Sequence, residues 1–440
     1  MASSNESASA NSAPPGRRSL IEAVVASTIG TTIEWYDFFL YGTAAAKVFP
    51  DLFFPESDRF TAQMSAFGTF AVGFVGRPFG GMLFGYLGDR VGRKSTLVAT
   101  LLLMGISTLL IGFLPTYAQM GVAAPIILTT LRFIQGVGVG GEWGGSVLLA
   151  LEFGHQGRRG FYASWPQAGV PLGMVSSTLV WMAFEVTLSP ADFQAWGWRV
   201  PFYVSGLLIV LGLLIRVRIF ETPLFRQLKE QGQIADAPIR ETIRRHWLEI
   251  LLAAGARIVE NAGFYLFTIY IHNYGANVLG LPSQVMLWAV SIAAALELVT
   301  IPLYGVLSDW LSRRATYIAG CVFFGVFAFP FFALLETRDP NLILLAIVVA
   351  LNGGHAALYA VQASLIPELF GTRLRYTGAS IAYQLASPLA GGLAPIIATW
   401  LVNRYPHEYW PLAVYVIIMS LVSLACVSWL AETSKKNISE

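Results

Sequence analysis

The chain has 440 residues, of which 55% are hydrophobic and only 12% are charged, and its mean hydropathy is +0.61. Soluble domains carry about 25% charged residues, so this composition excludes an ordinary soluble protein. The net charge of +2, with basic residues scattered over short segments, also excludes a nucleic-acid-binding surface. Apolar stretches long enough to cross a bilayer recur along the whole chain, which predicts an all-α membrane protein.

In chain order, the pattern predicts 12 transmembrane helices in two sets of six. Residues 1–19 are expected to form a disordered tail, residues 20–220 the first six spans, residues 221–247 a polar linker, residues 248–431 the second six spans and residues 432–440 a short tail. The predicted spans lie near 20–46, 62–87, 95–115, 122–150, 161–188, 198–219, 248–275, 284–307, 315–336, 341–366, 376–402 and 409–431.

The distribution of basic residues predicts that the N- and C-termini are both cytoplasmic. Of the 28 Lys and Arg residues, 20 lie in segments on the side of the termini, 5 lie in the opposite loops and 3 lie within spans. Cytoplasmic loops of membrane proteins are enriched in Lys and Arg.

Two pairs of similar loops relate the two halves. "GYLGDRVGRK" (85–94) follows span 2, and "GVLSDWLSRR" (305–314) follows span 8. "LEFGHQGRRGFYAS" (151–164) follows span 4, and "PELFGTRLRYTGAS" (367–380) follows span 10. Matched loops at matched positions predict a duplicated six-helix unit, the arrangement of transporters that are built from related halves.

These loops resemble motifs of a known family. The 85–94 loop resembles the signature of the major facilitator superfamily, and the 305–314 loop is similar to its second-half copy. Five segments resemble the metabolite:proton symporter branch, which includes transporters for shikimate, 2-oxoglutarate, citrate and proline or betaine. They are "EWYDFFLYG" (34–42), "RFIQGVGVGGEWGGS" (132–146), "WGWRVPF" (196–202), "ETPLF" (221–225) and "PELFGTRLRYTGAS" (367–380). The resemblance implies two six-helix bundles that alternate access around a central site, in a functional monomer of the bacterial cytoplasmic (inner) membrane.

Span 1 places two acids, Glu34 and Asp37, near the middle of the bilayer, where ionisable residues are usually functional. Arg132 of span 4 lies at a similar depth, and its planar guanidinium suits a carboxylate and keeps its charge. We expect Asp37 to carry the transported proton, Glu34 to assist it or to pack between helices, and Arg132 to bind the substrate anion. The alternative is a structural polar network that does not titrate.

The second half contains a comparable set. Arg257 and Glu260 lie one turn apart in span 7, so they either neutralise each other or Arg257 forms a second anion contact while Glu260 holds its orientation. Glu297 of span 8 is alternatively an acid that pairs with Arg257. Glu297 and His355 are further candidate proton sites, although a lone buried histidine is more often a hydrogen-bonded core residue. Arg77 of span 2, which lies among glycines, is predicted to be structural.

Polar or amphipathic residues on the spans expected to line the cavity complete the candidate substrate site. They are Tyr36, Tyr41, Gln135, Gln167, Tyr265, Asn352, Tyr383 and Gln384. Each of them also fits a role in helix packing.

Charged residues of the repeated loops are predicted, by the resemblance, to form a cytoplasmic gate. They are Asp89, Arg90, Arg93, Lys94, Glu152, Arg158, Asp309, Arg313, Glu368 and Arg373. Because a surface ion pair contributes only about 0–1 kcal/mol, a network of such pairs is able to open in each cycle. The alternative is that the arginines only fix the topology.

We therefore expect a proton-coupled symporter that imports a small carboxylate-bearing metabolite, because basic groups inside a bilayer need an anion nearby. Its expected partners are a small organic anion or zwitterion, protons and the lipid bilayer, with no cofactor, metal or nucleic acid. A betaine-like zwitterion bound by aromatic rings and a same-fold proton antiporter that exports drugs or metabolites stay open as alternatives. The chain lacks G-x-S-x-G, H-E-x-x-H and Walker motifs, so no enzyme activity is expected.

Overall fold

The computed structural model describes residues 17–155, 157–218, 221–406 and 408–436, and these residues form helices without any strand. The prediction of an all-helical protein is confirmed. Most of the predicted tail at 1–19, and residues 437–440 of the second tail, lie outside the described residues.

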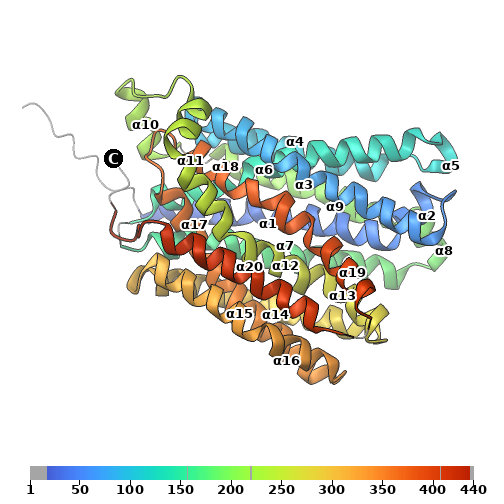
Figure 1. Cartoon of the computed structure of the whole chain (residues 1–440). Coiled ribbons are helices and arrows are strands. Elements are labelled where there is room, and N and C mark those ends of the chain that lie inside the picture. Colours follow the sequence, from blue (N-terminus) through green and yellow to red (C-terminus); the bar gives the residue numbers. More distant parts are fainter. Residues whose placement is uncertain (1–16, 156, 219–220, 407, 437–440) are drawn as a thin grey trace, which may run out of the picture.

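Long helices run side by side between two ends of the molecule (Figure 1). One end carries the short helix α10 (Pro223–Glu230) and is called the α10 end below. The opposite end, called the α5 end, carries the short helices α2 (Phe49–Phe53), α5 (Tyr117–Met120) and α8 (Pro190–Ala195).

The N-terminal half contributes six long helices, which are α1 (Arg17–Lys47), α3 (Arg59–Arg90), α4 (Arg93–Phe113), α6 (Ala123–Phe153), α7 (Arg159–Thr187) and α9 (Val200–Arg218), the last preceded by the 3₁₀ turn η1 (Gly197–Arg199). Three long helices of the C-terminal half are continuous, namely α14 (Ser283–Trp310), α15 (Arg313–Glu336) and α20 (Trp410–Trp429).

The other three helices of the C-terminal half contain π-helical segments. The first comprises α11 (Pro238–Ala256), α12 (Ile258–Tyr265), η2 (Leu266–Tyr270), α13 (Ile271–Asn273) and η3 (Tyr274–Val278). The second comprises α16 (Pro340–Val349), η4 (Ala350–His355) and α17 (Ala356–Glu368), and the third comprises α18 (Arg375–Ala386), η5 (Ser387–Gly392) and α19 (Ala394–Arg404). Such π-bulges occur frequently at functional sites.

Among the described residues, ten helices are long and apolar enough to cross a membrane. Helices α1 and α3 have 31 and 32 residues, which is ample length at about 1.5 Å per residue, but they carry ionisable side chains in their interiors. The total of twelve spans and the cytoplasmic placement of both termini stay predictions.

The helix bounds lie within a few residues of those predicted, except for the seventh span. Its helix begins at Pro238 instead of near residue 248, inside the segment predicted to be a polar linker. The backbone departs from helical geometry at His246 (φ −127°, ψ 25°), so α11 consists of two helices joined across a kink. The helix after the kink begins at the predicted bound, and the helix before it lies in polar sequence that hydropathy does not mark.

Close packing joins the elements that carry the candidate site. Helices α3 and α6 touch through glycines, since a Cβ at Gly80 would lie 1.9 Å from the carbonyl oxygen of Val137. The two halves meet along α7 and α14 and along α3 and α18. Residues that lie far apart in the sequence are therefore brought together at the contact between the halves.

Candidate functional site

Asp37 on α1 is fully buried and belongs to a hydrogen-bonded chain that ends at Arg132. Thr108 Oγ1 donates to Asp37 Oδ2 (2.9 Å), and Gln135 Nε2 donates to Thr108 Oγ1 (2.8 Å). Arg132 Nη1 in turn donates to Gln135 Oε1 (2.5 Å). The acid and the arginine that sequence reasoning paired are thus joined through two neutral side chains, and the second oxygen of Asp37, Oδ1, has no hydrogen-bond partner.

Arg132 is 1% exposed, and its Nε and Nη2 have no hydrogen-bond partner. Its guanidinium carbon lies 5.0, 4.2 and 4.8 Å from the ring centroids of Phe38, Tyr41 and Phe70. A buried charge without a counter-charge is unfavourable, and aromatic faces offset only part of that cost. The unpartnered N–H groups are therefore suited to an anion.

Arg77 on α3 has a similar environment, which sequence reasoning missed. Its guanidinium carbon lies 4.7 Å from the ring centroid of Phe38 and 4.6 Å from that of Phe74, and its Nη2 has no hydrogen-bond partner. The hydroxyl of Tyr265, from the C-terminal half, lies beside it. A second buried cation thus faces the contact between the halves, and the arginine inside an apolar span was the only signal for it in the sequence.

Glu34 is 3% exposed and forms no ion pair among the residues that the structure describes. Nearby, Glu142 on α6 is bound by both terminal nitrogens of Arg216, with Nη1 at 3.0 Å, and accepts hydrogen bonds from Thr100 and Ser146. Arg216, which the sequence placed in a cytoplasmic segment, is 2% exposed within α9. Glu142 is thus a fully bonded structural acid, whereas Glu34 has no such partner.

In the C-terminal half, four predicted or neighbouring residues form one chain of contacts. Arg257 Nε lies 3.3 Å from Glu260 Oε2, Glu260 Oε1 lies 3.5 Å from His355 Nε2, and His355 Nδ1 lies 2.6 Å from Glu297 Oε1. Arg257 Nη1 also donates to the carbonyl oxygen of Tyr383 (2.6 Å). The structure therefore joins the Arg257–Glu260 pair, which the sequence indicated, to the predicted residues His355 and Glu297.

Three predicted substrate contacts lie where the two halves touch. The ring of Tyr383 stacks on Trp143 at 3.5 Å, and Trp143 Nε1 donates to Gln167 Oε1 (3.0 Å). Gln167 Nε2 donates to the carbonyl oxygen of Tyr359 (2.8 Å), and Gln384 Nε2 donates to that of Gly140 (3.1 Å). The last two hydrogen bonds cross between the halves and must break if the halves separate.

The other predicted contacts are more distant from this interface. The hydroxyl of Tyr36 donates to the carbonyl oxygen of Pro201 (2.9 Å), and that of Tyr41 donates to Thr69 (2.6 Å). Asn352 Nδ2 donates to the carbonyl oxygens of Ala293 and Val348. For Tyr36 and Asn352 these contacts favour the packing role that the sequence left open.

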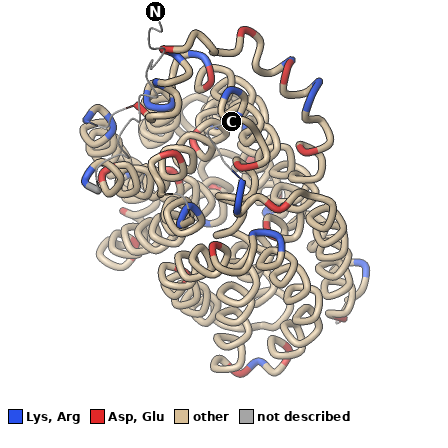
Figure 2. Tube along the Cα trace, turned by 90° about the vertical axis from the view of Figure 1, so that its left-hand side faces the viewer, with Lys and Arg blue, Asp and Glu red and all other residues tan. Residues whose placement is uncertain are grey.

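Six of the ten predicted gate residues belong to two equivalent networks at the α10 end, where basic and acidic residues lie interspersed (Figure 2). In the first, Arg93 Nη2 lies 3.3 Å from Asp89 and 3.7 Å from Glu152, and Arg375 Nη1 lies 3.3 Å from Glu152. All four side chains are at most 1% exposed. Arg375 belongs to the C-terminal half, so this network crosses between the halves.

The second network repeats the first with the halves exchanged. Arg313 lies 2.7 Å from Asp309 and 3.4 Å from Glu368, and Arg159 of the N-terminal half lies 3.5 Å from Glu368. The two networks are buried, in contrast to the surface ion pairs that the sequence suggested. Removing one partner of a buried pair costs more than removing one from a surface pair.

Each network also binds the start of a helix in the opposite half. Asp89 accepts hydrogen bonds from the backbone N–H groups of Tyr376 (3.2 Å) and Thr377 (2.8 Å) in the first turn of α18. Asp309 accepts them from Gly160 and Phe161 (both 2.9 Å) in the first turn of α7. The first N–H groups of a helix lack partners within it, so these two aspartates close the α10 end.

Four of the predicted gate residues lie outside these networks. Arg158 is exposed, and its place is taken by Arg159. Arg373 is paired with Glu241 of α11 (3.4 Å), and its place is taken by Arg375. The remaining two bond elsewhere, Arg90 to the hydroxyl of Tyr86 and Lys94 to the carbonyl oxygen of Val217.

Two further acids at the α10 end were missed by sequence reasoning. Glu221 accepts hydrogen bonds from the backbone N–H groups of Arg93 and Lys94 at the start of α4. Glu432 accepts them from Arg313 and Arg314 at the start of α15. The sequence did contain a signal, because "ET" follows the last helix of each half at 221–222 and at 432–433.

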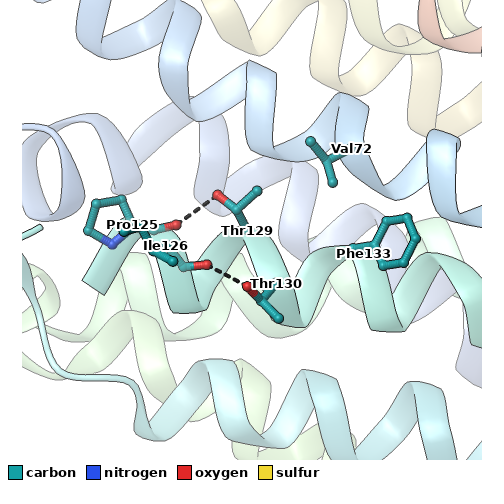
Figure 3. A pocket seen from close by; sticks show the side chains of 6 residues that line it. All are labelled: Val72, Pro125, Ile126, Thr129, Thr130 and Phe133. Atoms are coloured by element: carbon teal, nitrogen blue, oxygen red, sulfur yellow. Dashed lines mark hydrogen bonds between the residues drawn. The ribbon is translucent and has the colours of Figure 1, made fainter. Parts of the chain in front are cut away.

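A groove of about 460 Å³ lies on the outer surface of α3 and α6, away from these residues (Figure 3). Its lining is Val72, Pro125, Ile126, Thr129, Thr130 and Phe133. The two threonine hydroxyls donate to the carbonyl oxygens of Pro125 and Ile126 of their own helix. The groove therefore presents an apolar face without free polar groups, which is typical of a surface in contact with lipid.

The comparisons with known proteins agree with this architecture. The model of the Major Facilitator Superfamily matches residues 28–382 and 259–440. The inner membrane metabolite transport protein YhjE of Escherichia coli is 40% identical, over 87% of this chain and 88% of that protein. The shikimate transporter of the same organism is 37% identical, over 91% and 92%.

Among solved structures, the proton:xylose symporter XylE has a similar fold. Its TM-score is 0.79 at 18% sequence identity, over 96% of this chain and 98% of that one. At this identity the likeness shows the fold alone.

Proposed function

The chain belongs to the major facilitator superfamily, and we propose that it is a proton-coupled symporter for a small carboxylate-bearing metabolite. Its relatives are metabolite transporters, and it is a multi-pass protein of the bacterial inner membrane. The proton coupling and the class of substrate are the proposal.

The observation that carries this proposal is the environment of Arg132. Two of its nitrogens, Nε and Nη2, are buried without a hydrogen-bond partner. Asp37, the proposed proton carrier, is linked to Arg132 only through Thr108 and Gln135. A carboxylate is the ligand that an arginine fork binds best. Arg77 supplies a second cation next to the hydroxyl of Tyr265, which suits a substrate that combines a carboxylate with hydroxyl groups.

Asp37 and Arg132 suggest how a proton and a substrate become linked. While Asp37 is charged, it attracts Arg132 through the hydrogen-bonded chain and competes with an incoming anion. A proton on Asp37 removes that competition, so Arg132 binds the substrate carboxylate more tightly. By thermodynamic reciprocity, bound substrate then increases the affinity of Asp37 for its proton.

The two networks at the α10 end would supply the gate. We propose that this end faces the cytoplasm, in keeping with its many basic residues, and that the structure represents a state closed on that side. Opening would require Asp89 and Asp309 to leave the helix starts that they bind, and the halves to separate around the central residues.

The experiment is uptake into proteoliposomes of a panel that contains shikimate, other small carboxylates and glycine betaine, with and without an inward proton gradient. Asp37→Asn is compared with the wild type, and Asp236→Asn, an exposed aspartate of the segment between the halves, is the control. We expect accumulation of a carboxylate that depends on the gradient. It should be lost in Asp37→Asn, while exchange of labelled for unlabelled substrate continues.

Accumulation that survives Asp37→Asn would move the proton site to Glu34 or to the C-terminal half. Export of lipophilic cations against the gradient, without carboxylate uptake, would refute the symport proposal and support the antiporter alternative. Preferential uptake of glycine betaine would favour the zwitterion alternative, with rings such as that of Trp35 next to the cation.

A further inference from the structure

The contact chain in the C-terminal half contains a histidine between two acids. His355 Nδ1 faces Glu297 at 2.6 Å, and His355 Nε2 faces Glu260 at 3.5 Å. All three side chains are at most 2% exposed. A neutral imidazole donates from only one of its nitrogens, whereas the protonated ring donates from both. Among the described residues Nε2 makes no hydrogen bond, and Glu260 is the acid that it faces, so the two flanking carboxylates suit an imidazole that has bound an extra proton.

The balance of charge leads to the same reading. The cluster contains two carboxylates, Glu260 and Glu297, but only one permanent cation, Arg257, at 3.3 Å from Glu260. One proton bound at His355 makes the buried cluster neutral, and an uncompensated buried charge is unfavourable.

The surroundings hold the imidazole ring in place. Its faces stack on Phe264 (4.8 Å) and Tyr359 (4.9 Å), and His355 itself ends the π-helical segment η4. Arg77 of α3 lies near Tyr265 and Tyr383, and Cys321 of α15 lies near Tyr317. The other titratable groups that face the cluster among the described residues are tyrosines. From α12, α15, α17 and α18 these are Tyr265, Tyr317, Tyr359 and Tyr383.

We propose that Glu260 couples a proton on His355 to an anion on Arg257, and thereby gives the transporter a second proton-linked site in its C-terminal half. This inference rests on the proposed function and extends it. Glu260 is a positioning residue, because it acts on the substrate through Arg257.

The coupling follows from Glu260 having two partners. When His355 is neutral, Glu260 is held by Arg257 and opposes the binding of a second anion there. When His355 is protonated, it attracts Glu260 and leaves Arg257 more available to a substrate carboxylate. Since the linkage is reciprocal, an anion on Arg257 in turn favours the proton on His355.

The first test needs no substrate. Nitrogen-15 NMR of the five histidines, in the full chain in lipid nanodiscs, reports whether each ring is neutral or doubly protonated, and His355→Asn assigns the signal. We expect a doubly protonated His355 in the wild type and in the control Glu185→Gln, an exposed acid paired with Lys47. In Glu260→Gln, where one carboxylate remains for one arginine, we expect a neutral ring. The same ring state in Glu260→Gln as in the wild type would overturn the proposal.

The second test is the pH dependence of binding, with shikimate and glycine betaine as probes. With two linked protons, the slope of log Kd against pH should fall by about half in Glu260→Gln and by about half in Asp37→Asn, and Glu260→Asp should retain part of it. Exchange activity in proteoliposomes confirms that each variant is folded. An unchanged slope in Glu260→Gln, with a halved slope in Asp37→Asn, refutes the second site alone. A flat slope in the wild type refutes the proposed symport as well.

Discussion

Arg132 and Arg77 are buried arginines whose guanidinium groups face aromatic rings where carboxylates would be expected. Their neighbours determine how they are oriented. Arg132 packs against Gly73, where an added Cβ would lie 2.6 Å from its Nε and 3.0 Å from its guanidinium carbon. The absence of a side chain at Gly73 therefore leaves the space that this guanidinium occupies.

We predict that Gly73→Ala weakens substrate binding without any change of charge. The new methyl group would displace Arg132 from Gln135, and we expect a loss of affinity of about tenfold, or about 1.4 kcal/mol. Binding of the transported carboxylate to purified protein measures it. Gly68→Ala, on the same helix with nothing within 4 Å of an added Cβ, is the matched control and should bind as the wild type does. Equal affinities for the two variants would contradict the prediction.

At the scale of helices, four acids at the α10 end occupy the starts of four helices. Asp89 and Asp309 bind helices of the opposite half, whereas Glu221 and Glu432 bind helices of their own half. Carboxylates are favourable at helix N-termini because the first N–H groups are unpaired and the helix dipole is positive there. One pair thus joins the two halves at this end, and the other pair fixes the helices on which Arg93 and Arg313 of the proposed gate lie.

We predict that Glu432→Gln lowers the melting temperature of the protein and changes how that temperature depends on pH in the acid range. Burial acts to raise the pKa of Glu432, but hydrogen bonds from Ser312 and from the backbone of Ser434 and Arg314 outweigh it and lower the pKa from 4.5 to about 2. Because folding lowers this pKa, the charged carboxylate of Glu432 stabilises the folded state fully at pH values above the ordinary glutamate pKa of 4.5. That stabilisation is lost as the pH falls toward 2.

The expected loss for Glu432→Gln at neutral pH is roughly 1 kcal/mol, as for other helix caps. The measurement is the melting temperature in detergent as the pH is lowered from neutral. The difference from the wild type should shrink at the acid end of the series. Glu230→Gln, an exposed residue at the end of α10, should show no difference at any pH. A Glu432→Gln difference that is constant with pH would argue against the cap.

At the scale of the whole molecule, the two gate networks relate the halves by the same contacts with the roles exchanged. Arg375 of the C-terminal half bonds to Glu152 of the N-terminal half, and Arg159 of the N-terminal half bonds to Glu368 of the C-terminal half. Both contacts are buried and both must break for the halves to separate at this end. The loops that are repeated in the sequence thus form equivalent contacts between the halves.

We predict that Arg159→Gln and Arg375→Gln each favour the state open at the α10 end. Each change leaves a buried carboxylate short of a partner, which destabilises the closed state by roughly 3 kcal/mol. Labelling of a cysteine placed at Ser380, which is buried between the halves, measures the opening and should become faster. Arg158→Gln and Arg373→Gln alter the exposed neighbours and should label at the wild-type rate. Faster labelling in these controls would show that charge alone sets the equilibrium.

The sequence by itself determined that the protein is an all-helical membrane protein of its family and where most of its helices lie, because hydropathy and loop motifs are local properties. It also identified Asp37, Arg132, Arg257, Glu297 and His355, since an ionisable residue inside an apolar span stands out without any knowledge of its neighbours. Asp89 and Asp309 stood out as candidate gate acids for a similar reason, since they recur at equivalent positions of the two repeated loops.

Only the tertiary structure decided the partners. It separated Arg159 from Arg158 and Arg375 from Arg373, because residues one or two positions apart at a helix start point in different directions and only one of each pair enters the contact between the halves. It placed Thr108 and Gln135 between Asp37 and Arg132, and Glu260 between Arg257 and His355. The contacts of Thr108 with Asp37 and Gln135, and of Glu260 with His355, join residues on different helices. Their existence therefore depends on packing angles and side-chain directions that no single stretch of sequence contains.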